Sequence, residues 1–207
     1  MLQNRVDPRG NIIKTSARGS WMGNRGLLHD EHQNLVRPFK LQAWLICLLE
    51  FKGRKRPVMA PRQYTELFFL DEATAFSAGH RPCFECRRKD YDRFKTFWIK
   101  ANPEYGFDEK TSIRRIDEIL HKERIDPAGS KITCTGALKD LPDGSFIVYK
   151  DQPAVVVNSS IFPWSPFGYE KGILLPKEEK LTVLTPGSVV NAFRAGYLPQ
   201  IAIPSKT

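Results

Sequence analysis

The chain has 207 residues, 41% hydrophobic and 27% charged, a composition typical of a globular protein large enough to bury a core without disulfides. It has no apolar run of about 18 residues and no apolar signal core at its start, so we expect no membrane span and a cytoplasmic location. The net charge is +9: residues 1–100 hold 19 Lys and Arg against 10 Asp and Glu, whereas residues 101–207 hold 13 of each. This asymmetry favours a polyanion such as nucleic acid as the partner, over the alternatives of an acidic protein partner or a role of the charge in solubility alone.

The first part of the chain predicts short strands and loops. Residues 1–40 are rich in Gly, Asn and Arg and show no long periodic run. Residues 43–51 form a continuous apolar run of strand length, and after the basic turn 52–56 residues 57–59 predict its partner in a hairpin. Residues 64–70 are another strand candidate.

Three helices are predicted next. Asp71 is a candidate N-cap for a short helix over Glu72–Ala78, and Gly79 is placed to end it in the left-handed conformation. Residues 87–100 predict a longer helix, and 111–124 predict another. The apolar face of the longer helix comprises Tyr91, Phe94 and Trp98.

From Lys131 onward the pattern indicates a small β-rich unit. The predicted strands are 146–149, 154–157 and 181–184, separated by Pro and Gly turns. Thr185 and Pro186 then predict an N-cap and first turn of a last helix that ends at Gly196.

An internal similarity links two of the predicted helix ends. Residues 75–82 read Ala-Phe-Ser-Ala-Gly-His-Arg-Pro, and residues 192–199 read Ala-Phe-Arg-Ala-Gly-Tyr-Leu-Pro. We interpret the similarity as a shared helix–Gly–strand construction.

The fold class is therefore predicted as α+β. A basic region 1–105 is expected to hold a hairpin and helix unit that zinc staples through the Cys-x-x-Cys pair at Cys83 and Cys86. Region 106–207 is expected to hold a helix and the β-rich unit, ending in a helix and a strand. A boundary near 101–110 and one continuous domain are both open alternatives.

Cys83 and Cys86 form the most informative motif. A Cys-x-x-Cys pair lets two thiolates converge on one metal ion and usually supplies half of the ligands of a structural zinc site. The helix that follows favours thiolates at its N-terminus. A redox pair and two uninvolved buried cysteines are the alternatives.

The two remaining zinc ligands are expected to be His29 and Cys47. His32 and Cys134 are the substitutes, and His80 and His121 are further candidates. Cys47 alone is equally typical of a small buried apolar side chain, and loop histidines are often exposed without a role.

Residues 72–86, Glu-Ala-Thr-Ala-Phe-Ser-Ala-Gly-His-Arg-Pro-Cys-Phe-Glu-Cys, resemble the second half of the Ada-type zinc-binding domain. The match covers about residues 66–90 and extends loosely over 25–90. The resemblance implies zinc held by four cysteines, a basic surface that binds DNA phosphates, and one thiolate that accepts a methyl group from a methylated phosphate. Cys83 and Cys86 carry over as ligands. The first cysteine pair of that family has no counterpart here, so only Cys47 is left as an acceptor.

Basic side chains cluster around the motif and around the turn before it. These candidates for phosphate contacts are Arg54, Lys55, Arg56, Arg81, Arg87, Arg88 and Lys89. Such contacts supply affinity without reading sequence, and the alternative is a solvated basic face.

The sequence thus predicts a zinc-binding protein that binds nucleic acid, with DNA as the favoured form and a role as an accessory in DNA repair or processing. One alternative is a metal-dependent, nuclease-like hydrolase that uses the cysteine-held metal. Another is a non-catalytic protein-interaction module.

Overall fold

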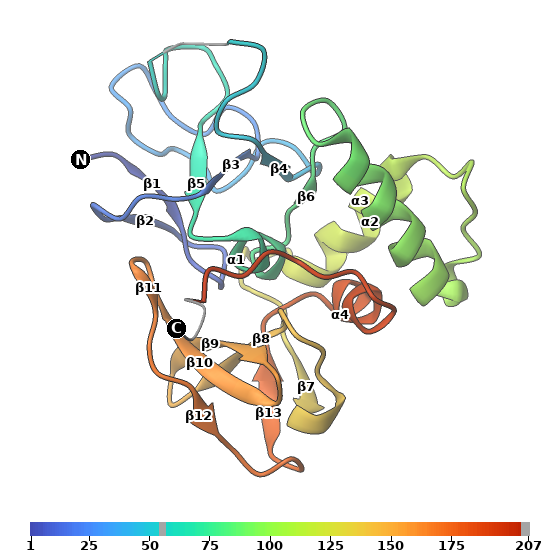
Figure 1. Ribbon diagram of the computed structural model, residues 1–207. Helices are drawn as coiled ribbons and strands as arrows, with labels where there is room; N and C mark the ends of the chain where they lie inside the picture. The colour runs from blue at the N-terminus through green and yellow to red at the C-terminus, as the bar shows by residue number, and fades with distance from the viewer. Residues whose placement is uncertain (54–56, 204–207) are drawn as a thin grey trace.

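Two β-sheets and four α-helices make up the part of the chain that the computed structural model describes, residues 1–53 and 57–203 (Figure 1). The predicted α+β class is confirmed. No helix within these residues is long and apolar enough to cross a membrane.

The first sheet is mixed and has the strand order β2-β1-β5-β3-β4-β6. Pairs β1–β5 and β4–β6 are parallel, and the other pairs are antiparallel. Its strands are β1 (Gln3–Val6), β2 (Ile12–Lys14), β3 (Trp21–Asn24), β4 (Leu45–Cys47), β5 (Leu67–Phe69) and β6 (Arg81–Pro82).

The second sheet is antiparallel throughout, with the order β11-β10-β9-β8-β13-β7 and with β12 paired to β10. Its strands are β7 (Cys134–Ala137), β8 (Phe146–Tyr149), β9 (Gln152–Val157), β10 (Ser160–Ser165), β11 (Gly168–Tyr169), β12 (Ile173–Leu174) and β13 (Lys180–Val183). The three strands predicted in this region are present. They could be predicted because short β-branched runs between turns are a strong local signal.

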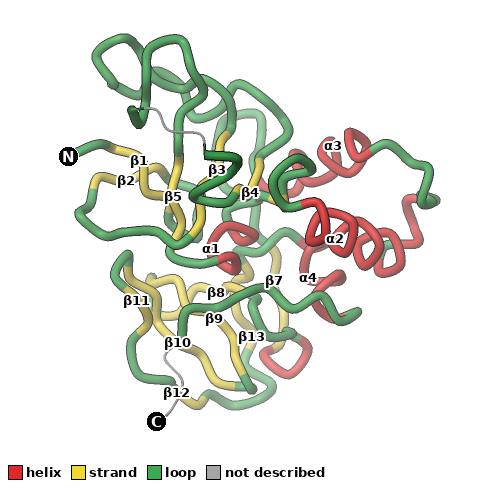
Figure 2. Tube along the Cα trace, turned by 45° about the horizontal axis from the view of Figure 1, so that its top comes forward, coloured by secondary structure: helices red, strands yellow, loops and turns green. Residues whose placement is uncertain are grey.

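The helices are α1 (Glu72–Ser77), α2 (Arg88–Ala101), α3 (Ile113–Arg124) and α4 (Gly187–Arg194), with short 3₁₀ turns at Pro103–Tyr105 and Leu138–Asp140. Helix α1 lies between the two sheets, and α2, α3 and α4 gather at one side of the molecule, as Figure 2 also shows. The side chain of Asp71 caps α1 by accepting the N–H of Thr74 at 2.8 Å, as predicted.

The main hydrophobic cluster joins residues on both sides of 101–110, where the sequence left a domain boundary as one of two alternatives. It joins Phe76 of α1 and Trp98 of α2 to Ile116 of α3 and Phe193 of α4. Burial of these large side chains supplies most of the favourable free energy that holds the helices together.

Helices α1 and α4 end in the same way. At Gly79 and at Gly196 the backbone φ is +85° and +110°, and each glycine N–H donates to the carbonyl oxygen three residues earlier. The next N–H, of His80 or of Tyr197, reaches back five residues in both cases, at 3.0 Å. This paired hydrogen-bond pattern is a Schellman motif, and it accounts for the internal similarity in the sequence.

The predicted hairpin between 43–51 and 57–59 is wrong. Only Leu45–Cys47 is a strand, and its antiparallel partner is β3 rather than residues 57–59. Met59 instead has a positive φ of 55°, and its N–H donates to the carboxylate of Glu66 at 2.8 Å. A backbone in that conformation cannot continue a strand.

The start of α4 also differs from the prediction. Pro186 rather than Thr185 is the N-cap, and its carbonyl accepts the first helical hydrogen bonds. The hydroxyl of Thr185 accepts the N–H of Phe146 at 2.9 Å, which draws it into the second sheet. No strand follows α4 as far as residue 203, the last one described.

Candidate metal centre

Three cysteine sulfur atoms meet at the end of the first sheet. The Sγ atoms of Cys47, Cys83 and Cys86 all lie within 4.8 Å of one another. A tetrahedral zinc ion with Zn–S bonds of about 2.3 Å separates its sulfur ligands by about 3.8 Å. A small inward movement of the thiols would therefore suffice to hold such an ion.

Parallel pairing of β4 with β6 brings Cys47 to the Cys-x-x-Cys motif. Leu45 pairs with Arg81 and Ile46 with Pro82, and the N–H of Cys83 continues the ladder to the carbonyl of Ile46 at 2.9 Å. Because parallel strands end at the same edge of a sheet, Cys47 at the end of β4 and Cys83 just after β6 become neighbours.

Backbone N–H groups point at the sulfur atoms. The N–H of Glu85 donates to Cys83 Sγ at 3.4 Å, the N–H of Cys86 bonds to the same thiol, and that of Leu48 bonds to Cys86. Such donors stabilise the thiolate form that binds a metal. Sequence reasoning missed these groups, because no side-chain identity marks a backbone donor.

Hydrogen bonds couple the three thiols. The side chain of Cys47, and then that of Cys86, lowers the pKa of Cys83 by hydrogen bonding. The pKa of Cys47 is raised, because its thiol is hydrogen-bonded to both neighbours and is buried. For Cys86, hydrogen bonding with Cys47 lowers the pKa, but hydrogen bonding with Cys83 and burial outweigh this and raise it. Binding of a metal ion would displace the protons that these thiols share.

The thiols line a cavity of about 420 Å³. Its apolar walls include Leu45, Phe51 and Phe68, and its acidic residues are Glu66 and Glu85. Within the described residues no fourth His, Cys, Asp or Glu joins the sulfur cluster. The donor set is therefore three soft sulfur atoms beside a cavity.

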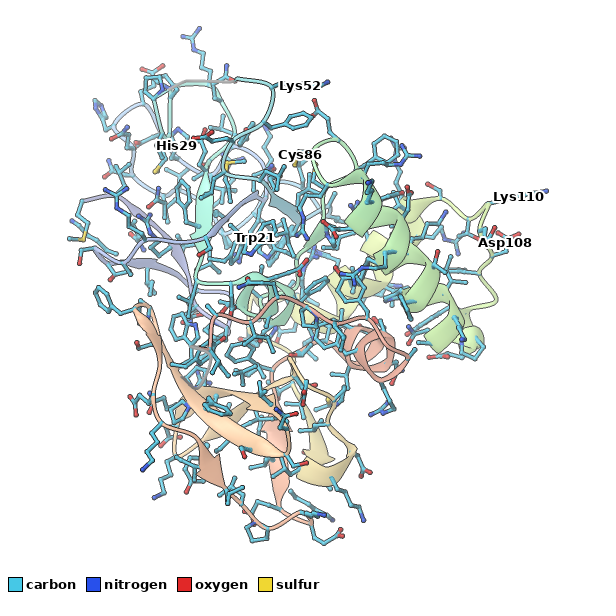
Figure 3. The ribbon with its side chains drawn as sticks, in the orientation of Figure 1. Trp21, His29, Lys52, Cys86, Asp108 and Lys110 are labelled. Atoms are coloured by element: carbon cyan, nitrogen blue, oxygen red, sulfur yellow. The ribbon has the colours of Figure 1, made fainter. Side chains whose placement is uncertain are left out.

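His29, the other expected ligand, is not part of the cluster. It is buried, with Nδ1 2.6 Å from the hydroxyl of Thr65 and Nε2 3.2 Å from the carbonyl of Ala60. Both ring nitrogens are thus engaged by neighbouring segments. Figure 3 labels His29 in the loops beyond β3 and Cys86 at the turn that leads into α2.

The other candidate ligands also lie outside the cluster. His32 is exposed, and Cys134 is exposed in the second sheet. Nε2 of His80 bonds to Arg25, and Nδ1 of His121 bonds to Arg124.

Arg81 does not face solvent as a phosphate contact would require. It is 4% exposed, and its Nε and Nη2 atoms donate to the two carboxylate oxygens of Asp117, each at 2.7 Å. This bidentate pair joins β6 to α3. Arg81 therefore supports the site from inside the protein, and its prediction as a nucleic-acid contact is wrong.

Arg87 is corrected for the same reason. It is 5% exposed and donates to Glu72 at 2.7 Å and to Asp90 at 2.9 Å, while its guanidinium lies 4.0 Å from the ring centre of Trp21. A buried cation that already has carboxylate partners would lose them by turning outward, at a cost of several kcal/mol.

Two of the predicted basic contacts remain exposed beside the cysteines. Arg88 pairs with Asp92 and lies 4.1 Å from the ring centre of Phe84, which is 53% exposed, and Lys89 is exposed next to it. The other three predicted contacts, Arg54, Lys55 and Arg56, lie outside the described residues.

No family model, curated protein or solved structure matches this chain.

Proposed function

We propose that Cys47, Cys83 and Cys86 bind a zinc ion and that the protein uses the surface beside this ion to bind nucleic acid. The observation that carries the metal site is the convergence of three sulfur atoms within 4.8 Å. Thiolates are soft ligands and favour zinc among the common divalent ions, whereas magnesium and calcium require oxygen. The likeness of residues 72–86 to the Ada-type zinc-binding domain supports the same ion.

The zinc acts as a structural staple in this proposal. Cys47 lies on β4, whereas Cys83 and Cys86 lie in the turn between β6 and α2. A bound ion would join these segments and fix the start of α2. Arg88 and Lys89, the exposed cations at that helix start, would then stand on a rigid support.

Nucleic-acid binding has its support in the distribution of charge. All of the net charge of +9 belongs to residues 1–100, which also contain the cysteine cluster. Arg88 and Lys89 offer charges for phosphates, and the exposed ring of Phe84 lies beside Arg88. Contacts of this type give affinity that falls as salt displaces the protein from the phosphates.

Metal analysis of purified protein tests the ion. We expect one zinc ion per chain in the wild type and loss of zinc in Cys47→Ala, Cys83→Ala and Cys86→Ala. Cys134→Ala and His29→Ala are the controls and keep the metal. A metal-free wild type with unchanged stability would overturn the zinc site.

Fluorescence anisotropy with a labelled DNA duplex tests the partner. Binding should weaken steeply between about 50 and 200 mM salt, and the double variant Arg88→Ala/Lys89→Ala should reduce the salt slope by about two. Lys110→Ala, in the loop before α3, is the exposed control (Figure 3). A protein-interaction module would show no salt-dependent binding of DNA.

The set of three protein ligands favours a second candidate, a metal-dependent hydrolase. Three protein ligands with a free position are typical of catalytic zinc, and Glu66 and Glu85 line the adjoining cavity. Three thiolates, however, carry more negative charge than the ion can neutralise, which weakens it as a Lewis acid. Cleavage of DNA decides between the two, because both candidates use the same three sulfur ligands: cleavage that Glu85→Gln abolishes would establish the hydrolase.

A further inference from the structure

A second cavity, of about 410 Å³, lies apart from the cysteine cluster. It is bounded by the β1–β2 turn at Gly10, by residues 35–38, and by the segment after α3. Its lining contains five cationic side chains and no Asp or Glu. The cations are Arg9, Arg25, Arg37, Arg124 and Lys131.

Two of these cations share one aromatic ring. The guanidinium carbons of Arg25 and Arg124 lie 3.8 and 3.9 Å from the centre of the Trp44 ring. Both side chains are 2% exposed. Since one face of a ring has room for only one guanidinium at this distance, the two groups lie on opposite faces of Trp44, and each gains a cation–π interaction.

Ordinary ion pairs do not compensate this charge. Within residues 1–53 and 57–203, no carboxylate lies at ion-pair distance from Arg25, Arg124 or Lys131. The acidic groups that act on them from further away, Asp7 and Asp117, are held by other partners. Both oxygens of Asp7 accept from Asn11, and both oxygens of Asp117 accept from Arg81. Arg81 and Arg87, by contrast, each have a buried carboxylate.

Burial and repulsion between the cations lower their pKa values. The pKa of Arg25 falls to about 9 through burial, although Asp7 opposes this. Burial and then Arg25 lower the pKa of Arg124 to about 8, and burial, Arg25 and Arg124 lower that of Lys131 to about 7. An anion placed among the three groups would relieve both effects.

Two donors in this cluster lack a hydrogen-bond partner among the described residues. They are Nη2 of Arg25 and Nε of Arg124, both fully buried. Nη2 of Arg25 lies close to Gly10, a residue of the cavity lining, since a Cβ added there would stand 3.8 Å away. Buried donors of this kind are rare in folded proteins, because each one forfeits the hydrogen bonds it makes in water.

We propose that this cavity binds a phosphomonoester whose phosphate is held by the cations that line it, Arg25, Arg124 and Lys131. A phosphate offers several acceptor oxygens and up to two negative charges, which matches two unpaired guanidinium donors and an ammonium group. Lys131 already donates to the carbonyl of Ser77 at 2.6 Å and keeps two further donors. The cavity exceeds the size of a phosphate alone, and its apolar wall suits the group that the phosphate carries. That wall includes Ile12, Leu35, Val36 and Pro38.

The phosphate has two sources that share this chemistry. One is the terminal phosphate of a nucleic acid, a reading that rests on the proposed function. The other is a small phosphorylated metabolite, which does not depend on it.

Isothermal titration calorimetry of the intact protein tests the pocket with inorganic phosphate as the probe. We expect saturable binding of one phosphate to the wild type and at least about ten-fold weaker binding in Lys131→Met and in Arg124→Gln. Arg62→Gln, an exposed cation paired with Glu31, is the control and binds as the wild type does. Circular dichroism spectra verify that each variant is folded, and Lys131→Met, at a half-buried position, is the variant with the smaller effect on packing. Absence of saturable binding, or equal binding by all variants, would overturn the proposal.

Two oligonucleotides of one sequence, with a 5′-phosphate or a 5′-hydroxyl, distinguish the sources. A preference of about ten-fold for the phosphorylated end that Lys131→Met abolishes identifies a nucleic-acid end. Phosphate binding without that preference identifies a small phosphomonoester. Salt-dependent DNA binding without phosphate binding would reject this pocket and leave the proposed function standing. Phosphate binding without any DNA binding would support the pocket and reject the proposed nucleic-acid binding.

Discussion

The guanidinium of Arg81 and the carboxylate of Asp117 form two parallel hydrogen bonds of 2.7 Å in the protein interior. Arg81 lies two residues before Cys83, and Asp117 lies in the middle of α3. The pair therefore connects the strand that carries the cysteine motif to a helix from the other half of the chain.

Removal of Asp117 should destabilise the protein strongly. Asp117→Ala leaves the Arg81 guanidinium buried without its anion, and we expect a loss of about 3–5 kcal/mol in the free energy of unfolding. Asp92→Ala breaks the exposed pair with Arg88 and should cost about 1 kcal/mol or less. Urea unfolding of both variants measures the difference, and equal losses would contradict the structural role of Arg81.

Gly79→Ala should be costly for two reasons. The residue has φ +85°, and an added Cβ would stand 2.8 Å from the Cβ of Arg124 and 3.1 Å from its Cγ. Backbone strain and overpacking together predict a loss of about 3 kcal/mol. Gly106→Ala is the matched control, since Gly106 has φ +63° with open space around it and should lose only about 1 kcal/mol. Urea unfolding of the two variants measures both losses, and similar values would show that Arg124 yields to the new methyl group.

Lys131 should make stability depend on pH in the alkaline range. Its pKa is about 7 in the folded protein against 10.5 in the unfolded chain, so folding favours the neutral amine. The contribution is complete above pH 10.5 and is lost as the pH falls through 7. Between pH 7 and 9 in phosphate-free buffer, the wild type should gain about 1–2 kcal/mol relative to Lys131→Met. Unfolding curves at each pH measure this gain, and parallel profiles would contradict it.

Alkylation should separate Cys134 from the other three cysteines. Cys134 is exposed in β7, whereas a zinc ion on Cys47, Cys83 and Cys86 would occupy their sulfur atoms. Mass spectrometry after brief treatment with iodoacetamide should find one modified cysteine in the zinc-loaded protein. After chelation, Cys86, which is only half-buried, and Cys83, whose pKa is lowered, should react as well. Equal reactivity with and without chelator would count against the bound ion.

Local signals in the sequence predicted local structure well. Asp71 as a cap, Gly79 as a helix end and the strand at Phe146–Tyr149 follow from interactions within a few residues. The two Schellman motifs show the same point, since Ala-Phe-x-Ala-Gly gives one geometry at both sites.

Long-range pairing was the part that the sequence did not reveal. Cys47 was expected near the motif, but through a hairpin rather than through parallel pairing of β4 with β6. The side chains of Arg81 and Arg87 were expected in solvent because arginine usually lies there, yet carboxylates on α3 and α1 draw them inside. His29 has the chemistry of a ligand, but Thr65 and Ala60 engage its ring. The cluster of Arg25, Arg124 and Lys131 carries no motif, since its members meet only in the folded chain.

The contacts of Gln200 show that segments from the start of the chain complete their packing only with residues near 200. Its side-chain oxygen accepts from the indole N–H of Trp21 at 3.0 Å, and its backbone N–H donates to the carboxylate of Glu72 at 2.9 Å. Phe193 and Tyr197 likewise pack on Phe76. During synthesis from the N-terminus, the core next to the first sheet and α1 therefore stays partly exposed until residues near 200 have been made. A nascent chain arrested before α4 would expose that apolar surface to chaperones and to aggregation.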